Sequence, residues 1–147
     1  MKQLKKIVLT GASGRLGSYL REPLSYKAEK LVSLDINPIG KTLKNEQFEL
    51  ADLSNYAEIE RVLEGADVVV HFAALSNEGP FEKILEANIV GAFNIWKAAQ
   101  EHRIKRIIFA SSIHSVGMHQ STSMINSNVM HRPDTFYGLS KCFGEDL

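Results

Sequence analysis

The chain has 147 residues, a common size for one domain and long enough to bury a substantial core. Its apolar share of 44% and charged share of 23% are typical of a globular protein and argue against both a disordered chain and a membrane protein. Seventeen basic residues balance seventeen acidic ones, so there is no excess positive charge to bind nucleic acid or a membrane surface. The expected partner is therefore a small molecule.

The cysteine count and the N-terminus indicate the compartment. Cys142 is the only cysteine, so no disulfide can form within the chain, which fits a reducing cytosol. The basic stretch Met1–Lys6 is followed only by the apolar run Ile7–Leu9. That run is shorter than the roughly 7–15 residues of a secretory signal or the about 20 of a spanning helix. We expect a cytoplasmic protein.

Short runs of β-forming residues alternate with helix-like stretches, which is the pattern of βαβ units and a parallel sheet. Strands are expected at Leu4–Thr10, Leu31–Asp35, Gln47–Leu50, Asp67–Phe72 and Lys105–Ala110. Helices are expected at Gly14–Ser25, from the cap Ser54 to Leu63, at Pro80–His102, and from Pro133 or Asp134 onward. The sequence therefore predicts an α/β fold: one Rossmann-type domain over residues 1–147, with a doubly wound parallel sheet in three α/β/α layers.

Two features break the alternation. The stretch from Ser112 to Arg132 is irregular and rich in Ser, Asn, Met and His, and loops of this length are usually functional or mobile. The last helix has only a few turns before Leu147. We therefore expect the chain to be the N-terminal part of a longer protein, truncated after its active-site helix begins and without the C-terminal substrate-binding portion.

A glycine-rich turn joins the first strand to the first helix. Gly11, Gly14 and Gly17 are spaced three apart, which allows a tight turn, close approach of the backbone to a pyrophosphate, and close packing of helix on sheet. The N-terminus of the helix then directs free N–H groups at the anion. Position between a strand and a helix favours a dinucleotide site over a plain tight turn. The predicted cofactor contacts in this turn are Gly11, Ser13, Gly14, Arg15, Leu16 and Gly17.

Asp35 ends the second strand, 18 residues past Gly17, where an acidic residue commonly binds the adenosine ribose. Its carboxylate would repel a 2′-phosphate, which favours NAD over NADP, and the neighbouring Ile36 is included in the predicted cofactor site. Arg15 is the opposing signal, since a cation in the glycine turn can accept that phosphate. The alternative for Asp35 is an ordinary turn or helix-cap aspartate.

Further candidates follow the third and fourth strands. Asp52 and Leu53 are either an adenine contact or a simple strand-end turn, and the small residues Ala73 and Ala74 let a cofactor lie against the backbone. His71 is more consistent with a packed strand residue than with a catalyst. All of these candidates fall at the carboxyl ends of strands, which is the edge where open α/β sheets bind ligands.

Tyr137 and Lys141 are four residues apart and so share one face of the last helix. Free tyrosine has a pKa of about 10, too high for a base at neutral pH, but a nearby ammonium and a positive nicotinamide ring favour the phenolate. Ser111 and Ser112, which follow the fifth strand, can supply a hydroxyl that holds the substrate oxygen. The pair alone is common on solvated helix faces; its position after a phosphate-binding turn makes it a candidate catalytic site.

Asn88 lies on the apolar stripe of the long helix, formed by Phe81, Ile84, Leu85, Ala92, Ile95 and Ala99. A buried amide needs partners, so Asn88 is expected to bond backbone or an ordered water. Its role is either structural or one of carrying protons away from Lys141. The spacing of His114, His119 and His131 matches no familiar metal motif, and no metal is expected.

With these residues identified, the chain resembles the extended short-chain dehydrogenase/reductases, also called NAD-dependent epimerases/dehydratases, and among them the bacterial uronate dehydrogenases. The segments that carry the resemblance are Glu86–Asn94, Phe109–Gly117 and Arg132–Leu147. The resemblance extends over essentially the whole chain and is most specific in the last of these segments. The resemblance implies NAD-dependent oxidation of the C1 hydroxyl of glucuronate or galacturonate to an aldarolactone.

The resemblance also implies residue roles. Tyr137 would be the base and a cofactor contact, and Lys141 its partner and a ribose contact. The sugar would be bound by Ser76, Ser112, Ile113, His114 and Tyr137. The family tends to have Asn at the position of Ile113, and its substrate carboxylate is held by an arginine beyond residue 147. Dimers packed through two helices are common in the family, which makes a homo-oligomer a candidate assembly.

Two other functions remain open. The first is an epimerase or dehydratase of a nucleotide-linked sugar in the same superfamily. Dehydratases usually carry an acidic pair after the strand-five hydroxyl residue, and Ile113–His114 at that position argues against dehydration but not against epimerisation. The second is a non-catalytic dinucleotide-sensing module or a truncated, inactive dinucleotide-binding product. The intact Tyr137–Lys141 pair argues against a pure sensor, whereas the missing C-terminal half argues for inactivity of this piece.

Overall fold

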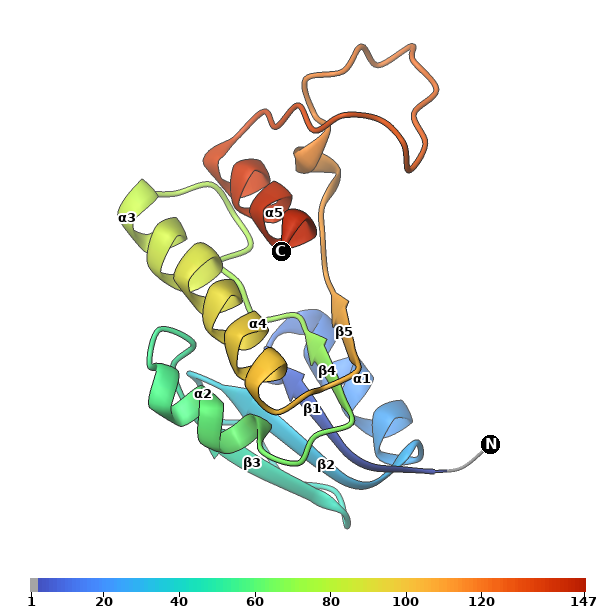
Figure 1. Cartoon of the computed structure of the whole chain (residues 1–147), viewed down its shortest axis with the longest axis vertical. Helices are drawn as coiled ribbons and strands as arrows, with labels where there is room; N and C mark the ends of the chain where they lie inside the picture. The colour runs from blue at the N-terminus through green and yellow to red at the C-terminus, as the bar shows by residue number, and fades with distance from the viewer. Residues whose placement is uncertain (1–2) are drawn as a thin grey trace.

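The structure, a computed structural model, describes residues 3–147; Met1 and Lys2 of the basic N-terminal stretch lie outside the described residues. Five strands form one sheet in the order β3-β2-β1-β4-β5, and every neighbouring pair is parallel (Figure 1). Their bounds are Leu4–Thr10 for β1, Ala28–Asp35 for β2, Glu46–Leu50 for β3, Val68–His71 for β4 and Arg106–Phe109 for β5. The predicted Rossmann-type parallel sheet is confirmed.

Helices cover both faces of the sheet. Helix α1 (Arg15–Ser25) packs on β1 and β2 from one side, while α2 (Tyr56–Leu63) and α4 (Gly91–Glu101) pack together on the other (Figure 1). Helix α4 continues without a break from α3 (Phe81–Ile84) through the π-helical segment η1 (Leu85–Val90). Helix α5 (Phe136–Asp146) packs against α3 and η1. The three α/β/α layers expected from the sequence are therefore present.

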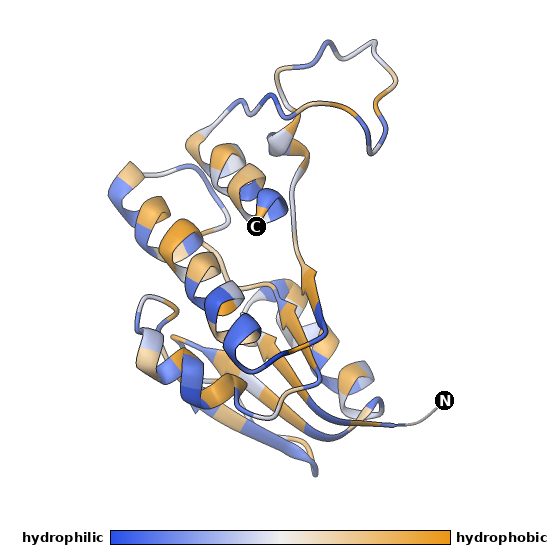
Figure 2. Cartoon of the chain, in the orientation of Figure 1, coloured by the Kyte–Doolittle hydropathy of each residue, from blue (hydrophilic) through white to orange (hydrophobic). Residues whose placement is uncertain are grey.

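The apolar core has two parts because the central strands are buried on both faces. Successive strand residues point to opposite faces, so Ile7 and Leu9 pack toward α1 while Val8 packs toward α2 and α4. Val69 and Val70 of β4 divide in the same way. Figure 2 shows mostly apolar residues along these strands in the middle of the domain. This is the reason for the continuous apolar runs in the sequence.

The direction in which the chain adds strands to the sheet reverses between β1 and β4. From β1 the chain builds the sheet outward to β2 and β3, then returns across β1 to add β4 and β5 on its other side. The loops that follow β1 and β4 therefore leave the sheet in opposite directions and open a crevice between them. This crevice lies at the carboxyl ends of the strands, where the candidate residues fall.

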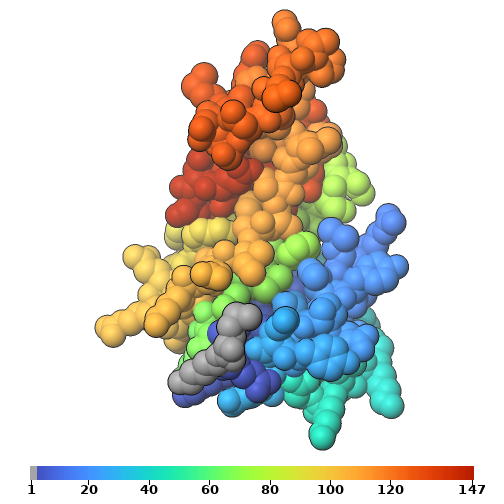
Figure 3. All heavy atoms as spheres, turned by 90° about the vertical axis from the view of Figure 1, so that its right-hand side faces the viewer, coloured from blue at the N-terminus to red at the C-terminus, as the bar shows by residue number. Residues whose placement is uncertain are grey.

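The long segment between β5 and α5 has no regular structure except the short 3-10 helix η2 (Ile113–Ser115). Its two ends are held together, because Met118 N donates to Arg132 O at 2.9 Å and Arg132 N donates to Ser115 O at 2.9 Å. Figure 3 shows the resulting loop at the upper end of the molecule, next to α5. We refer to residues 116–132 as the β5–α5 loop.

Two predicted helix starts were wrong. The last helix begins at Phe136 rather than at Pro133 or Asp134, because the Thr135 side chain caps it by accepting a hydrogen bond from Gly138 N at 2.8 Å. Helix α2 is capped by Asn55, which accepts from Glu58 N, and not by Ser54. The Ser54 hydroxyl donates to Asp52 instead.

The predicted apolar stripe on the long helix is only partly buried. Ile84, Ala92, Ile95 and Ala99 belong to the core, whereas Phe81 and Leu85 are 38% and 39% exposed. The reason is that α3 extends past the edge of the sheet, where Phe81 meets the ring of Phe136 at a centroid distance of 5.2 Å (Figure 1). No helix within residues 3–147 combines the length and the apolar character needed to cross a bilayer.

Candidate active site

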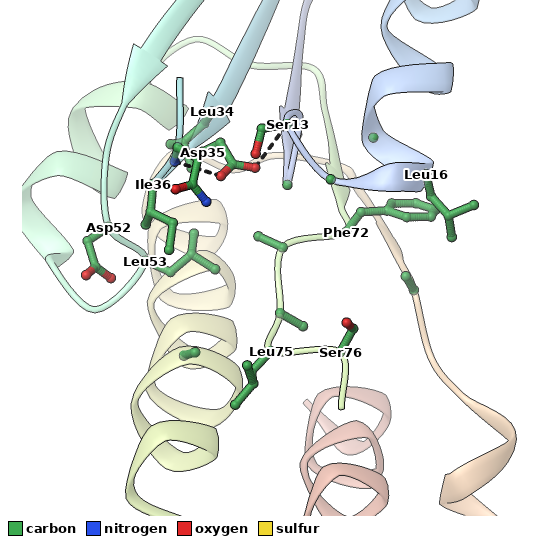
Figure 4. A pocket seen from close by; sticks show the side chains of 18 of the residues that line it. Ser13, Leu16, Leu34, Asp35, Ile36, Asp52, Leu53, Phe72, Leu75 and Ser76 are labelled. Atoms are coloured by element: carbon green, nitrogen blue, oxygen red, sulfur yellow. Dashed lines mark hydrogen bonds between the residues drawn. The ribbon is translucent and has the colours of Figure 1, made fainter. Parts of the chain in front are cut away.

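A cleft of about 650 Å³ lies at the carboxyl ends of the strands, in the crevice between β1 and β4. This volume is typical of small-molecule sites. Figure 4 shows the cleft between Asp35 at the end of β2 and the segment Phe72–Ser76 after β4. Every residue predicted to bind the cofactor lines it: Gly11, Ser13, Gly14, Arg15, Leu16, Gly17, Asp35, Ile36, Asp52, Leu53, Ala73, Ala74, Tyr137 and Lys141.

The glycine turn depends on the absence of side chains at Gly11 and Gly17. Gly11 has a φ of +75°, and a Cβ there would lie 2.6 Å from Ala73 N. A Cβ on Gly17 would lie 1.9 Å from the carbonyl oxygen of Gly11, which is backbone and cannot move aside. The turn thus brings bare backbone to the cleft at the N-terminus of α1, where free N–H groups and the helix dipole favour an anion.

We expect Gly17→Ala to destabilise the domain by about 1–3 kcal/mol, because the added methyl group overlaps the Gly11 carbonyl. The same displacement opens the glycine turn and weakens dinucleotide binding. Thermal denaturation and calorimetric titration with NAD measure the two effects. The matched control is Gly40→Ala, since a Cβ at Gly40 meets nothing within 4 Å. Equal stability of the two variants would contradict the role given to Gly17.

The carboxylate of Asp35 is held at the end of β2 by two backbone donors. Ser13 N donates to Oδ2 at 3.0 Å and Asn37 N donates to Oδ1 at 2.9 Å. Each carboxylate oxygen keeps a further lone pair for a ligand hydroxyl. Asp35 is only 8% exposed, yet it lines the cleft and is directed into it (Figure 4). The turn interpretation and the ribose-binding interpretation are thus compatible at this residue.

Asp52, like Asp35, both stabilises a turn and lines the cleft. Its Oδ1 accepts from both the amide and the hydroxyl of Ser54 at 2.9 Å, which is an ordinary turn that leads into α2. Asp52 and Leu53 also line the cleft beside Asp35 (Figure 4). The strand-end turn is therefore present, and the adenine contact stays a prediction.

Tyr137 and Lys141 lie at the other end of the cleft, on α5. Lys141 is only 4% exposed, and its Nζ lies 4.9 Å from the ring centroid of Phe109 and 5.4 Å from that of Tyr137. Burial lowers the pKa of Lys141 from 10.5 to about 8, because the charged form loses water. At neutral pH this places a poorly solvated ammonium beside the phenol, which is the arrangement expected from the sequence.

Asn88 ties the loop after β4 to α5. Its amide oxygen accepts from Leu75 N at 2.7 Å, and its amide nitrogen donates to Leu75 O at 3.1 Å and to Ser140 Oγ at 3.0 Å. The Ser140 hydroxyl in turn donates to Tyr137 O at 2.7 Å. The predicted bonding to backbone is confirmed, while a role in moving protons stays a prediction. Asn88 lies in the π-helical segment η1, and such segments are frequent at functional sites.

The predicted substrate residues do not all share the cleft wall. Ser76 lines it, whereas Ser112, Ile113 and His114 lie outside its lining, on and before η2. The Ser112 hydroxyl accepts from His114 N at 3.2 Å, and the Ile113 side chain is 81% exposed. The His114 ring meets the Tyr137 ring edge-on at 5.8 Å, so this group adjoins the cleft through Tyr137.

Sequence reasoning missed several residues that line the cleft. Lys83, Glu86 and Ala87 have the i, i+3, i+4 spacing of one helix face, a signal that could have identified them. Ser111 was predicted, together with Ser112, to supply a hydroxyl to the substrate; it lines the cleft too, and its hydroxyl donates to Glu145. The other missed residues are Leu34, Asn37, Ala51, Phe72, Leu75 and Ala110.

His71 lies below the cleft, fully packed inside the domain. Its Nδ1 is 2.7 Å from Thr10 Oγ1, and its ring stacks on Phe109 and meets Trp96 edge-on. Burial, and then the charge of Lys141, lower the pKa of His71 from 6.5 to about 3. The imidazole is therefore neutral at any physiological pH, which agrees with a packed strand residue.

Glu78, in the loop after β4, caps the helix that carries Tyr137. Its Oε2 accepts from Tyr137 N at 2.9 Å and its Oε1 accepts from Phe136 N at 3.3 Å. These are first-turn amides with no partner inside the helix, and a carboxylate also complements the positive end of the helix dipole. Glu78 and Thr135 together fix the start of α5 relative to the cleft.

We expect Glu78→Ala to lower the free energy of unfolding by about 0.5–2 kcal/mol, because two backbone donors lose their acceptor. Chemical denaturation of the variant measures the change. The control is Glu29→Ala, an exposed acidic position on β2. Surface changes of that kind usually stay within about 0.5 kcal/mol. An equally small effect for Glu78→Ala would show that water replaces the carboxylate at no cost.

Comparison with known proteins agrees with this geometry. Residues 7–147 match the NAD dependent epimerase/dehydratase family. The uronate dehydrogenase of Pseudomonas putida is 43% identical over 143 residues, which cover 97% of this chain and 53% of that protein. The crystal structure of uronate dehydrogenase from Agrobacterium tumefaciens is 41% identical, covers 97% of this chain and 53% of that one, and superposes with a TM-score of 0.93.

A mutant of the Agrobacterium tumefaciens enzyme complexed with NAD superposes equally well, with a TM-score of 0.93 at 40% identity over 97% of this chain and 54% of that one. The chain spans about half the length of the curated relatives it matches. The family match nevertheless extends over nearly all of its residues, including the glycine turn, Asp35, Tyr137 and Lys141. The chain belongs to the NAD dependent epimerase/dehydratase family.

Proposed function

We propose that this chain is the dinucleotide-binding half of an NAD-dependent uronate dehydrogenase, a cytoplasmic enzyme that oxidises the C1 hydroxyl of glucuronate or galacturonate to an aldarolactone. The observation that carries the proposal is the single cleft that joins the glycine turn and Asp35 to Tyr137 and Lys141. A carrier bound at the first pair reaches the reacting groups at the second. The similarity to uronate dehydrogenases over 97% of the chain supports the choice of substrate.

The residues of the cleft fit a dinucleotide. Bare backbone at Gly11 and Gly17, where a Cβ would overlap other backbone, forms a cradle for a pyrophosphate at the N-terminus of α1. Asp35 would accept hydrogen bonds from the ribose hydroxyls, and its carboxylate would repel a 2′-phosphate, so NAD is preferred to NADP. Ile36, Asp52 and Leu53 would surround the adenine. When bound, NAD accepts the hydride from the substrate carbon.

Side chains of the protein would remove the proton of the C1 hydroxyl. Tyr137 would take this proton as general base, with the Lys141 ammonium beside it stabilising the phenolate. The low solvation of Lys141 strengthens that interaction, because few waters screen it. Ser76, Ser112 and His114 would hold sugar hydroxyls, with Ile113 as an apolar neighbour. Asn88 keeps α5 at a fixed distance from the loop that carries Ser76.

The first experiment tests cofactor binding with the chain itself. We expect calorimetric titration to show NAD binding at least about tenfold tighter than NADP, a difference of about 1.4 kcal/mol. Asp35→Asn removes the negative charge but keeps the shape of the side chain, and should reduce the difference between the affinities for NAD and NADP. Preference for NADP, with Arg15→Ala reversing it, would contradict the assignment of Asp35.

The second experiment tests the reaction with the complete enzyme. Galacturonate or glucuronate should give NADH and a lactone, while galactose, which lacks the carboxylate, should react poorly. Turnover of a UDP-linked sugar without net formation of NADH, and no reaction with uronates, would replace the proposal by a nucleotide-sugar epimerase.

A further inference from the structure

His114 and Asp134 form a side-chain pair beside the candidate base. The His114 Nδ1 lies 2.8 Å from Asp134 Oδ1 and 3.1 Å from Oδ2, so the imidazole faces both carboxylate oxygens. The hydrogen bond to His114 is the main reason that the pKa of Asp134 is lowered from its usual value. Asp134 is therefore ionised under ordinary conditions.

The position of Asp134 is fixed by its surroundings. Its carboxylate fills the space above Gly117, where a Cβ would lie 2.2 Å from Oδ2. Its backbone N–H donates to His114 O at 3.4 Å, and the Thr135 hydroxyl donates to Oδ1 at 3.3 Å. A carboxylate anchored at both its backbone and its side chain can hold the ring of His114 in one orientation.

His114 is also fixed against the helix that carries Tyr137. Gly138 packs directly on its backbone, since a Cβ on Gly138 would lie 2.2 Å from His114 O. The ring itself meets the Tyr137 ring edge-on, with centroids 5.8 Å apart and planes at 72°. The imidazole is thus placed next to the phenol that lines the cleft.

The chemistry of the pair determines where the imidazole hydrogen lies. An ionised carboxylate only accepts hydrogen bonds, so Nδ1 of His114 must carry the hydrogen. In the neutral imidazole Nε2 then has a free lone pair, on the side of the ring away from Asp134. The His114 side chain is 44% exposed, so a ligand can reach the ring.

We propose that Asp134 is a positioning residue that holds His114 as the Nδ1–H tautomer, so that Nε2 accepts a hydrogen bond from a sugar hydroxyl beside Tyr137. That the donor is a sugar hydroxyl rests on the proposed function, whereas the tautomer of His114 rests only on its contact with Asp134. The hydroxyl held in this way lies next to the one that Tyr137 deprotonates. In the opposite tautomer, Nε2 of His114 would carry the hydrogen and could not accept a hydrogen bond from the sugar hydroxyl.

Nuclear magnetic resonance of the nitrogen-15 labelled chain tests the tautomer without any substrate. At mildly alkaline pH, His114 should show a protonated Nδ1 and an unprotonated Nε2. His119 is an internal control of opposite sign, because its Nε2 donates to Met130 O at 2.9 Å. Asp134→Ala should give mixed tautomers at His114 and leave His119 unchanged. Protonation of His114 at Nε2 in the unsubstituted chain would overturn the proposal.

Steady-state kinetics of the complete enzyme test the consequence. Asp134→Asn should lower kcat/KM for the uronate by roughly 10- to 100-fold, as for other residues that orient a ligating histidine. The KM for NAD should stay unchanged, since Asp134 lies outside the cleft lining. The matched control is Asp146→Asn, since Asp146 on α5 forms a second acid–histidine pair, 3.5 Å from His131 Nδ1 of the β5–α5 loop. A loss in both variants, or in neither, would overturn the positioning role. If the unsubstituted enzyme does not oxidise uronates, the proposed function fails. The positioning of His114 by Asp134 is then tested by the nitrogen-15 spectra alone.

Discussion

Replacing Tyr137 by phenylalanine is expected to lower kcat for uronate oxidation by roughly 10²- to 10⁴-fold, because the substitution removes only the group that accepts the proton. The aromatic ring stays, and with it the edge-on contact to His114 and the position of Lys141 Nζ over the ring. The wall of the cleft is therefore preserved. Because any cofactor contact of the Tyr137 ring is kept, a calorimetric titration should give the same NAD affinity for both proteins.

The combination of lost turnover and unchanged NAD binding separates a base from a binding residue. Lower NAD affinity in Tyr137→Phe would mean that the hydroxyl serves mainly to hold the cofactor. Substantial residual turnover would assign the base to another group near the cleft. Of the titratable groups there, Lys83 and Glu86 also line the cleft and would be the next positions to substitute.

Replacing Lys141 by methionine is expected to abolish turnover and to stabilise the protein. Methionine keeps the length and shape of the side chain but removes a charge that is only 4% exposed. Since burial lowers the pKa of Lys141 from 10.5 to about 8, the ammonium costs stability on the order of 3 kcal/mol in the folded state. Thermal denaturation of both proteins measures the gain.

The pH dependence of this gain distinguishes the charge from packing. Below about pH 8 the lysine is charged in both states, and the folded state carries the full cost of burying it. Between about pH 8 and 10.5 the folded state releases its proton while the unfolded state retains it, so the native protein becomes more stable as pH rises. The advantage of Lys141→Met should therefore be largest below pH 8 and shrink toward pH 10.5.

The control for Lys141→Met is Lys105→Met, an exposed lysine before β5. That change should alter stability by no more than about 0.5 kcal/mol at any pH. If Lys141→Met lowers stability below pH 8, the contacts of Nζ with the rings of Phe109 and Tyr137 outweigh the loss of hydration. The expected increase in stability from Lys141→Met would then be wrong.

The sequence predicted the sheet and the cofactor end of the cleft well, because both depend on local signals. Apolar runs identify buried strands, and the glycine spacing identifies the turn at Gly11–Gly17. The strand order then brings the ends of all five strands to one edge. For this reason every predicted cofactor residue lies on one wall or another of the same cleft.

The features that the sequence did not predict depend on contacts between distant residues. Glu78 caps α5 from 58 residues away, and no local pattern indicates this. The start of α5 was placed too early because the side chain of Asp134 bonds to His114, which leaves Thr135 to cap the helix. The π-helical segment coincides with the tertiary bonds of the Asn88 amide to Leu75 and Ser140, which no local pattern indicates.

The closed base of the β5–α5 loop has a practical meaning for protein engineering. The hydrogen bonds of Met118 and Ser115 with Arg132 join the two ends of the loop, and residues 120–128 beyond them are all exposed. Changes in the length of a loop whose ends are already held together cost little free energy. A peptide epitope inserted between Thr122 and Ser123 should therefore leave Tyr137 and the cleft in place, and this position suits immobilisation or labelling of the protein.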